Sequence, residues 1–122
     1  MSETPENARR FQRVSVGPEC RVQFVAAKNM YDDLPVQNIS LGGCGILIPA
    51  LAAQLLEKDM LLRELVVNHP KLPCVPLQGR VAFLLGKHNP DPDAVSVVGI
   101  EFIDQHPDFK LALESLIAEL TA

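Results

Sequence analysis

The sequence contains no tryptophan, and aromatic residues make up only 5% of its 122 residues. Small barrels that bind single-stranded nucleic acid use aromatic side chains as stacking platforms along a positively charged groove. This chain instead carries a formal net charge of −4, which disfavours broad binding to polyanions and to anionic membrane surfaces. The composition therefore argues against a protein that binds nucleic acid polymers.

Cysteine is also scarce. Cys20, Cys44 and Cys74 are odd in number, far apart in the sequence and without a C-x-x-C spacing. Neither a disulfide framework nor a zinc site is therefore indicated. We expect the three thiols to be reduced and partly buried.

Long apolar runs are missing as well. No stretch approaches the length that crosses a bilayer, and the first residues are polar where a signal peptide would be basic and then apolar. Hydrophobic residues make up 48% and charged residues 21%, as in ordinary globular proteins. We therefore expect one folded cytoplasmic domain with its own core and no membrane insertion.

Short apolar or alternating segments, separated by turn residues, recur through most of the chain. In residues 20–27, for example, Val22 and Phe24 alternate with Arg21 and Gln23, as expected for a half-buried strand. A turn is predicted over residues 28–33, which contain an asparagine and two aspartates, and a short helical turn opens the ambiguous residues 50–65. Extended segments are predicted at residues 14–16, 20–27, 34–41, 45–48, 61–67, 75–85 and 95–103.

The final segment changes to a helical period. Pro107 suits the first position of a helix, and apolar residues from Phe109 to Leu120 recur at helical spacing. Its polar face is not basic, which favours packing on the barrel over a membrane role. About six short strands followed by one helix predict an all-β fold, a barrel whose open end is covered by a C-terminal α-helix.

No arrangement of side chains indicates an enzyme. His69, His88 and His106 lie in turn-like settings near prolines, share no motif with a nucleophile, and are expected to be solvated. Asp91 and Asp93 match a calcium loop only in part, because prolines interrupt it and the distal glutamate is missing. We expect neither catalysis nor a bound metal.

Basic residues are concentrated near the start. Arg9, Arg10, Arg13 and Arg21 fall in one short segment whose only acidic residue is Glu19. Arginine without lysine favours forked recognition of phosphates or base edges over diffuse attraction. The alternative is a solvated basic tail, and residues 1–13 are in either case expected to form a flexible segment before the domain of residues 14–122.

A second polar group lies in residues 36–46. On a strand, Asn38 and Ser40 would share the face opposite Ile39, and the glycines that follow, Gly42 and Gly43, allow positive φ or close approach to the backbone. This pattern is typical of a docking surface, but an ordinary hairpin with a polar solvent face would show it too.

The two groups together match a known pattern. Residues 9–13 form an R-x-x-x-R motif, and residues 38–43 form an N-x-S-x-x-G motif about two strands later. In this order and separation they resemble the PilZ domain family, and residues 79–81 and 99–102 look like the family's later strands. The resemblance covers residues 8–118 and is closest to the PilZ half of flagellar-brake (YcgR-type) proteins.

The resemblance implies a six-stranded antiparallel β-barrel that binds cyclic di-GMP (c-di-GMP), a bacterial second messenger. The ligand is the only small molecule implied, with no further cofactor. Arg10 lies between the matched arginines and would either touch phosphate or remain solvated. The residues expected to bind the ligand are Arg9, Arg10, Arg13, Asn38, Ser40 and Gly43.

The chemistry of these residue types fits such a ligand. A guanidinium can grip guanine O6 and N7, stack on the ring or pair with phosphate oxygens. The Asn38 amide oxygen can accept from guanine N1 and N2, and Ser40 can bond a phosphate or sugar oxygen. Gly43 would leave room for the ligand.

The function implied is a receptor or adaptor that couples c-di-GMP level to an unidentified effector protein in motility, biofilm or secretion control. The arginine segment would fold over the bound nucleotide. Flagellar-brake proteins carry another barrel before the PilZ domain, so the chain is expected to be a stand-alone adaptor or a fragment. The alternative is a PilZ-like module that binds only proteins.

Overall fold

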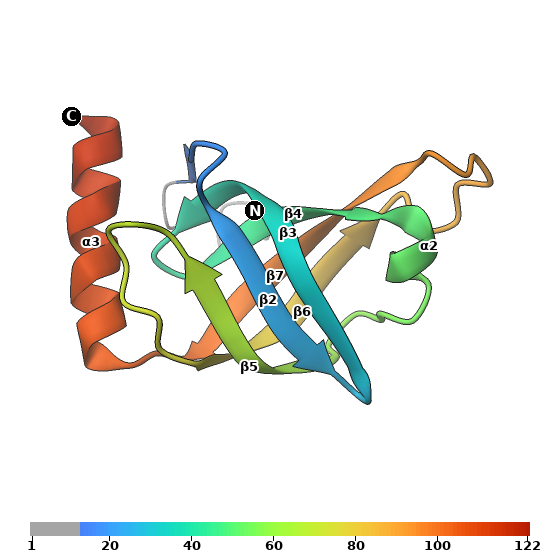
Figure 1. Ribbon diagram of the computed structural model, residues 1–122, viewed down its shortest axis with the longest axis horizontal. Helices are drawn as coiled ribbons and strands as arrows, with labels where there is room; N and C mark the ends of the chain where they lie inside the picture. The colour runs from blue at the N-terminus through green and yellow to red at the C-terminus, as the bar shows by residue number, and fades with distance from the viewer. Residues whose placement is uncertain (1–12) are drawn as a thin grey trace, which may run out of the picture.

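The computed structural model describes residues 13–122, which form the strands and helices of Figure 1. The ambiguous residues after Pro49 form one short helix followed by a strand, as predicted. The elements are β1 (Val14–Ser15), β2 (Arg21–Ala26), β3 (Asn29–Ser40), β4 (Gly43–Pro49), α2 (Ala50–Ala53), β5 (Leu61–Asn68), β6 (Leu77–Leu85), β7 (Val95–Asp104) and α3 (Pro107–Thr121).

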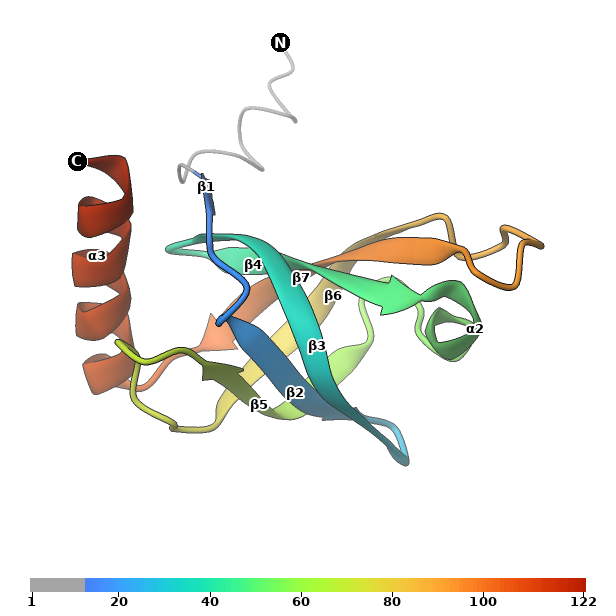
Figure 2. The same cartoon turned by 45° about the horizontal axis from the view of Figure 1, so that its top comes forward.

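The strands form one antiparallel sheet that closes on itself. Their order is β1-β3-β2-β5-β6-β7-β4, and β4 also pairs with β3, so six strands complete a ring (Figure 2). Closure leaves no long sheet edge, which is how barrels avoid exposing unpaired backbone groups. The short β1 adds to the end of β3 through Val14↔Ile39 and Ser15↔Asn38. The predicted six-stranded antiparallel barrel is confirmed.

The turn predicted over residues 28–33 is wrong. The chain reverses more tightly, at Ala27 and Lys28, and β3 already begins at Asn29. Pairing shifts from Val22↔Leu34 to Phe24↔Tyr31, so β3 carries an extra residue, and Asp33 adopts a φ of 53°. A β-bulge therefore accounts for the aspartates that suggested a turn, because short polar residues tolerate the left-handed region.

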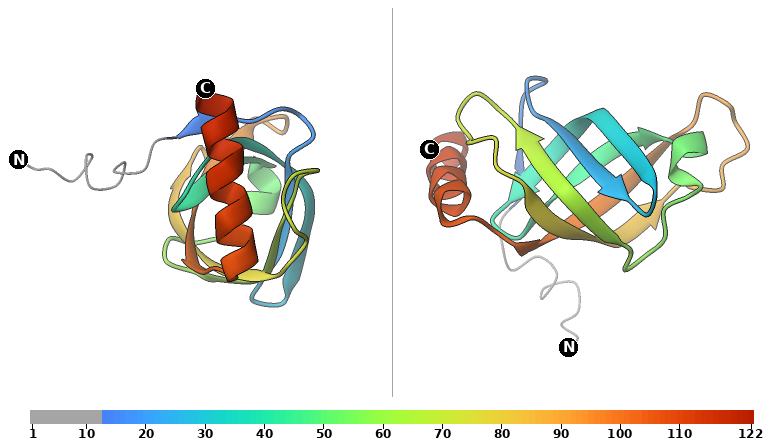
Figure 3. Two further views of the ribbon diagram at one scale, coloured as in Figure 1. Left: turned by 90° about the vertical axis from the view of Figure 1, so that its left-hand side faces the viewer. Right: turned by 60° about the horizontal axis from the view of Figure 1, so that its bottom comes forward.

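The core lies inside the barrel and under α3. Alternation along β2 buries Val22 and Phe24. The helix packs across one end of the barrel (Figure 3), as predicted, and Phe109 meets the Phe102 ring edge-on at a centroid distance of 5.8 Å. The largest fully buried side chains are Phe24, Phe109, Ile39, Ile46, Ile48, Leu56, Leu62, Leu65, Leu113, Val22, Val67 and Val81.

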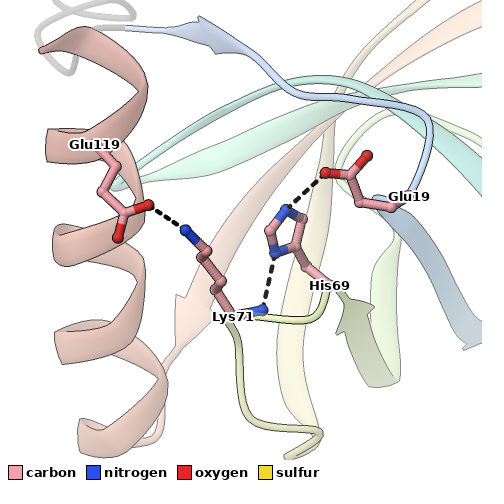
Figure 4. Close-up of polar contacts among 4 residues, drawn as sticks. All are labelled: Glu19, His69, Lys71 and Glu119. Atoms are coloured by element: carbon pink, nitrogen blue, oxygen red, sulfur yellow. Dashed lines mark hydrogen bonds and ion pairs between the residues drawn. The ribbon is translucent and has the colours of Figure 1, made fainter.

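Polar contacts join α3 to the loop after β5, and that loop to the segment before β2 (Figure 4). Lys71 pairs with Glu119 of the helix. The neighbouring His69 accepts a hydrogen bond from the Lys71 amide through Nδ1, and its Nε2 lies 3.5 Å from Glu19 Oε2. The His69 side chain is only 6% exposed, so the expectation that it is solvated is wrong.

A further packing constraint lies at the start of β4. A β-carbon on Gly43 would come within 2.0 Å of the Ile100 carbonyl oxygen, whereas one on Gly45 would meet only the Asn38 side chain, at 3.0 Å. The β7 backbone cannot move aside without disturbing the barrel, but a side chain can rotate. Gly43 is therefore needed for the close pairing of β4 with β7.

Gly43→Ala should destabilise the protein by about 1–3 kcal/mol, the usual cost of overpacking a filled site. Urea unfolding followed by circular dichroism measures this loss. The matched control is Gly45→Ala, which should change the free energy of unfolding much less. Equal urea midpoints of unfolding for the Gly43→Ala variant and wild type would contradict the packing role of Gly43.

The thiols give a second prediction. Cys20 and Cys44 are buried and Cys74 is exposed. Burial raises the pKa of Cys20 to about 11, and burial also raises the pKa of Cys44. Because the thiolate is the reactive form, only Cys74 should react with a thiol reagent at pH 8. Mass spectrometry should find one modified cysteine in the native protein and three in urea; rapid native modification of Cys44 would contradict this.

Candidate functional site

Arg13, the last residue of the first motif, meets the second motif at the junction of β1 and β3. Arg13 stands immediately before β1, and its Nη1 donates a hydrogen bond to Asn38 Oδ1 at 3.3 Å. The contact follows from the pairing of Ser15 with Asn38, which lays the start of the chain along the end of β3. Arg9 and Arg10 lie outside the described residues.

Asn38 reaches the outer face of the barrel through a second β-bulge. Pairing shifts from Val36↔Ile46 to Asn38↔Gly45, so β3 again holds one residue more than its partner. Ile39 is fully buried while Asn38 is half-buried, which agrees with the predicted alternation. The missing β-carbon of Gly45 lets the Asn38 amide lie flat over β4.

Ser40 shapes the turn between β3 and β4. Its hydroxyl accepts from the Gly42 amide at 3.2 Å and donates to the Gly43 carbonyl at 3.3 Å, and the residue is only 6% exposed. Neither Gly42 nor Gly43 has a positive φ, so the turn does not need the conformational freedom expected of them. Among the described glycines only Gly86 has a positive φ. Both hydrogen-bonding functions of Ser40 are therefore used in holding the turn.

The turn is also tied to the strand and linker that lead into α3. The Phe102 amide donates to the Gly42 carbonyl at 2.8 Å, and Gln105 Nε2 donates to the Leu41 carbonyl at 3.1 Å. Gln105 Oε1 is buried and has no hydrogen-bond partner among the described residues. The position of the turn is thus fixed from the side of β7.

A ring and an amide lie side by side on this outer face. Gly45 pairs with Gly99, and Gly99 pairs with Phe83 on β6. A β-carbon on Gly99 would come within 2.1 Å of the Phe83 ring, so the ring lies on Gly99 as Asn38 lies on Gly45. We call Gly45 and Gly99 the glycine pair, because both are buried in the barrel wall and their missing β-carbons leave room for the Asn38 amide and the Phe83 ring above them.

Reasoning from the sequence did not identify Gly45 or Phe83 as parts of the site. The available signal was a glycine inside each of two long strands, which often marks a place where another group approaches the backbone. Only the register shows that the glycines of β4 and β7 are direct neighbours. This arrangement could therefore not be assigned without the barrel.

The other arginines near the motifs are neutralised by acids. Arg21 Nε lies 2.9 Å from Asp33 Oδ1, and Arg80 Nη2 lies 2.6 Å from Glu101 Oε1. Within residues 13–122, the only hydrogen-bond partner of the Arg13 side chain is Asn38, which is neutral. Arg13 is thus the basic side chain best placed to meet an anion at this surface.

Two further features of residues 13–122 bear on the site. No helix there is long and apolar enough to cross a membrane. No group of three or more His, Cys, Asp or Glu side chains is placed to hold a metal ion in that part of the chain.

Solved structures share this architecture. The PilZ domain of YcgR from Escherichia coli, solved with c-di-GMP, is 18% identical with a TM-score of 0.65, over 93% of this chain and 91% of that chain. MrkH from K. pneumonia, solved as a c-di-GMP complex, is 18% identical with a TM-score of 0.71. This match covers 93% of this chain and 51% of that chain, so the chain spans about half the length of MrkH.

The sequence comparisons give two results. A search of curated proteins finds no match. A family model described as the PilZ domain matches residues 7–119, nearly the whole chain. The chain belongs to the PilZ domain family.

Proposed function

We propose that the chain is a c-di-GMP receptor that does no chemistry on its ligand. The observation that carries the proposal is the hydrogen bond from Arg13, the last residue of the arginine motif, to Asn38, the first residue of the second motif. Two structures of similar fold were solved with c-di-GMP. The site described above has the groups that a guanine nucleotide requires.

Ligand binding would exchange weak contacts for stronger ones. The Arg13–Asn38 bond is long and exposed, so it stabilises the free protein little. With a guanine in place, Asn38 Oδ1 can accept from the base N1 and N2, while Arg13 turns to phosphate or to guanine O6 and N7. Charge-assisted bonds of this kind are roughly twice as strong as neutral ones.

The remaining residues of the two motifs divide into two roles. Arg9 and Arg10 precede Arg13 by a few residues and would supply further guanidinium groups to phosphates or base edges. Ser40 and Gly43 would contact the ligand, as the motif implies, and both also hold the turn that positions Asn38. The partly exposed Phe83 ring, which lies on the buried Gly99, would offer a flat surface to a planar base.

The proposed receptor has two parts. Residues 1–13 would be a flexible segment that closes over the nucleotide, and residues 14–122 would be the preformed barrel that receives it. The ordered segment would then give an effector protein a new surface to read. We place the protein in the cytoplasm, with motility, biofilm or secretion as the processes it would control.

Isothermal titration of c-di-GMP tests the proposal. Wild type should release heat at micromolar protein concentration, and Arg9→Ala, Arg13→Ala should bind at least about tenfold more weakly, because each lost charge-assisted bond is worth more than 1 kcal/mol. The matched control is Arg63→Ala, which removes an exposed arginine that bonds the Ala27 carbonyl and lies outside both motifs. The control should bind like wild type.

Two results would contradict the proposal. One is the absence of heat from wild type, which would favour a module that binds only proteins. The other is equal affinity for wild type and the double variant, which would place the nucleotide elsewhere on the barrel. Circular dichroism of each variant should show that the fold is retained.

A further inference from the structure

One stretch of the barrel wall has an open edge. Strand β6 pairs with β5 up to Arg80, and two more backbone bonds join Val81 to Asp59 and Met60. Asp59 has a φ of 71°, which turns the preceding chain away from β6. Residues 82–85 therefore continue to pair with β7 on one side but have no strand beside them on the other.

A hollow of about 670 Å³ lies along this open edge. The hollow is lined by Ala82, Phe83 and Leu84 of β6. Its basic lining residues, which we call the rim, are Lys58, Lys87 and His88. An unpaired strand edge beside an open hollow is the setting in which an extended peptide adds to a sheet, because main-chain groups supply the hydrogen bonds.

The rim is basic in an otherwise acidic protein. Lys58 and Lys87 outnumber the single acid of the lining, Glu57, whereas the chain as a whole has a net charge of −4. The Lys87 ammonium is held in place by the Leu56 carbonyl, which leaves its other protons free to donate. The rim is therefore complementary to carboxylates.

Two large aliphatic side chains are also exposed, one at the end of β6 and one next in sequence to the residue that holds Lys87. Leu55, next to the residue that holds Lys87, is 60% exposed, and Leu85, at the end of β6, is 59% exposed. Because side chains alternate along an added strand, one face of such a strand could meet these leucines while the other directs acids toward the lysines. Both features favour an extended segment with alternating aliphatic and acidic residues.

We propose that the edge of β6 at residues 82–85 is a docking site for an acidic, extended segment of a partner protein. Two copies of this chain pairing edge to edge would face their basic rims toward each other, since a two-fold interface brings like patches together. Like charges at close range oppose that arrangement. Phe83 borders both this edge and the proposed nucleotide surface. The docking proposal still does not depend on the nucleotide proposal, because the partner would be bound through backbone, lysine and leucine groups.

Fluorescence anisotropy with two labelled peptides tests this site in the absence of nucleotide. The probes are the acidic peptide acetyl-EVEVEV-amide and its basic counterpart acetyl-KVKVKV-amide. The full chain should bind the acidic peptide at high micromolar to millimolar concentration and the basic peptide at least about tenfold more weakly. Amide signals of residues 82–88 should shift in magnetic resonance spectra recorded with the acidic peptide.

The Lys58→Glu variant reverses a charge on the rim, and the matched control Lys110→Glu reverses an exposed charge on α3. Lys58→Glu should weaken acidic-peptide binding several-fold, and Lys110→Glu should leave it near the wild-type value. Equal loss in both variants, equal binding of the two peptides, or no shift at residues 82–88 would overturn the proposal. A concentration-dependent dimer that protects these amides would assign the edge to a second copy and would overturn it too.

Discussion

The structure depends on the closure of the barrel between β3 and β4. A four-residue turn joins the two strands, and the turn fits because Gly43 has no β-carbon where the Ile100 carbonyl lies. Ser40 completes the turn with its hydroxyl, and the Phe102 amide fixes it from β7. Closure thus rests on the close approach of two backbones, which no larger residue at position 43 would allow.

The candidate site is a consequence of the same closure. Once β4 lies between β3 and β7, the glycine pair comes together, and Asn38 and Phe83 lie on it from opposite sides. The pairing of β1 with the end of β3 then brings Arg13 to Asn38. The barrel supplies the ring and the amide, and Arg13 supplies a guanidinium group. A preformed surface of this kind lowers the ordering cost of binding.

Much of this organisation could be predicted from the sequence. The short alternating segments and the helical period after Pro107 predicted a barrel with a helical cover, and the resemblance carried by the motifs predicted its six antiparallel strands. The ligand contacts of the motif residues stay a prediction. The rest depended on contacts between residues distant in the chain. The aspartates of β3 indicated a turn, because the local conformational preference of a residue does not reveal a β-bulge. His69 was expected to be solvated, because the residues that bury it lie on other loops of the chain. Gly45 and Phe83 became part of the site only through register.

The central claim is that c-di-GMP binds on the outer face where Arg13, Asn38, the glycine pair and Phe83 meet. Amide proton–nitrogen correlation spectra recorded during a c-di-GMP titration test it most directly. The account predicts that the largest shifts fall on residues 13, 38, 45, 83 and 99, with little change at the outer face of α3 or along β5. Shifts centred on β5, on α3 or on residues 84–88 beyond Phe83, with the amides of residues 38 and 45 unmoved, would contradict it.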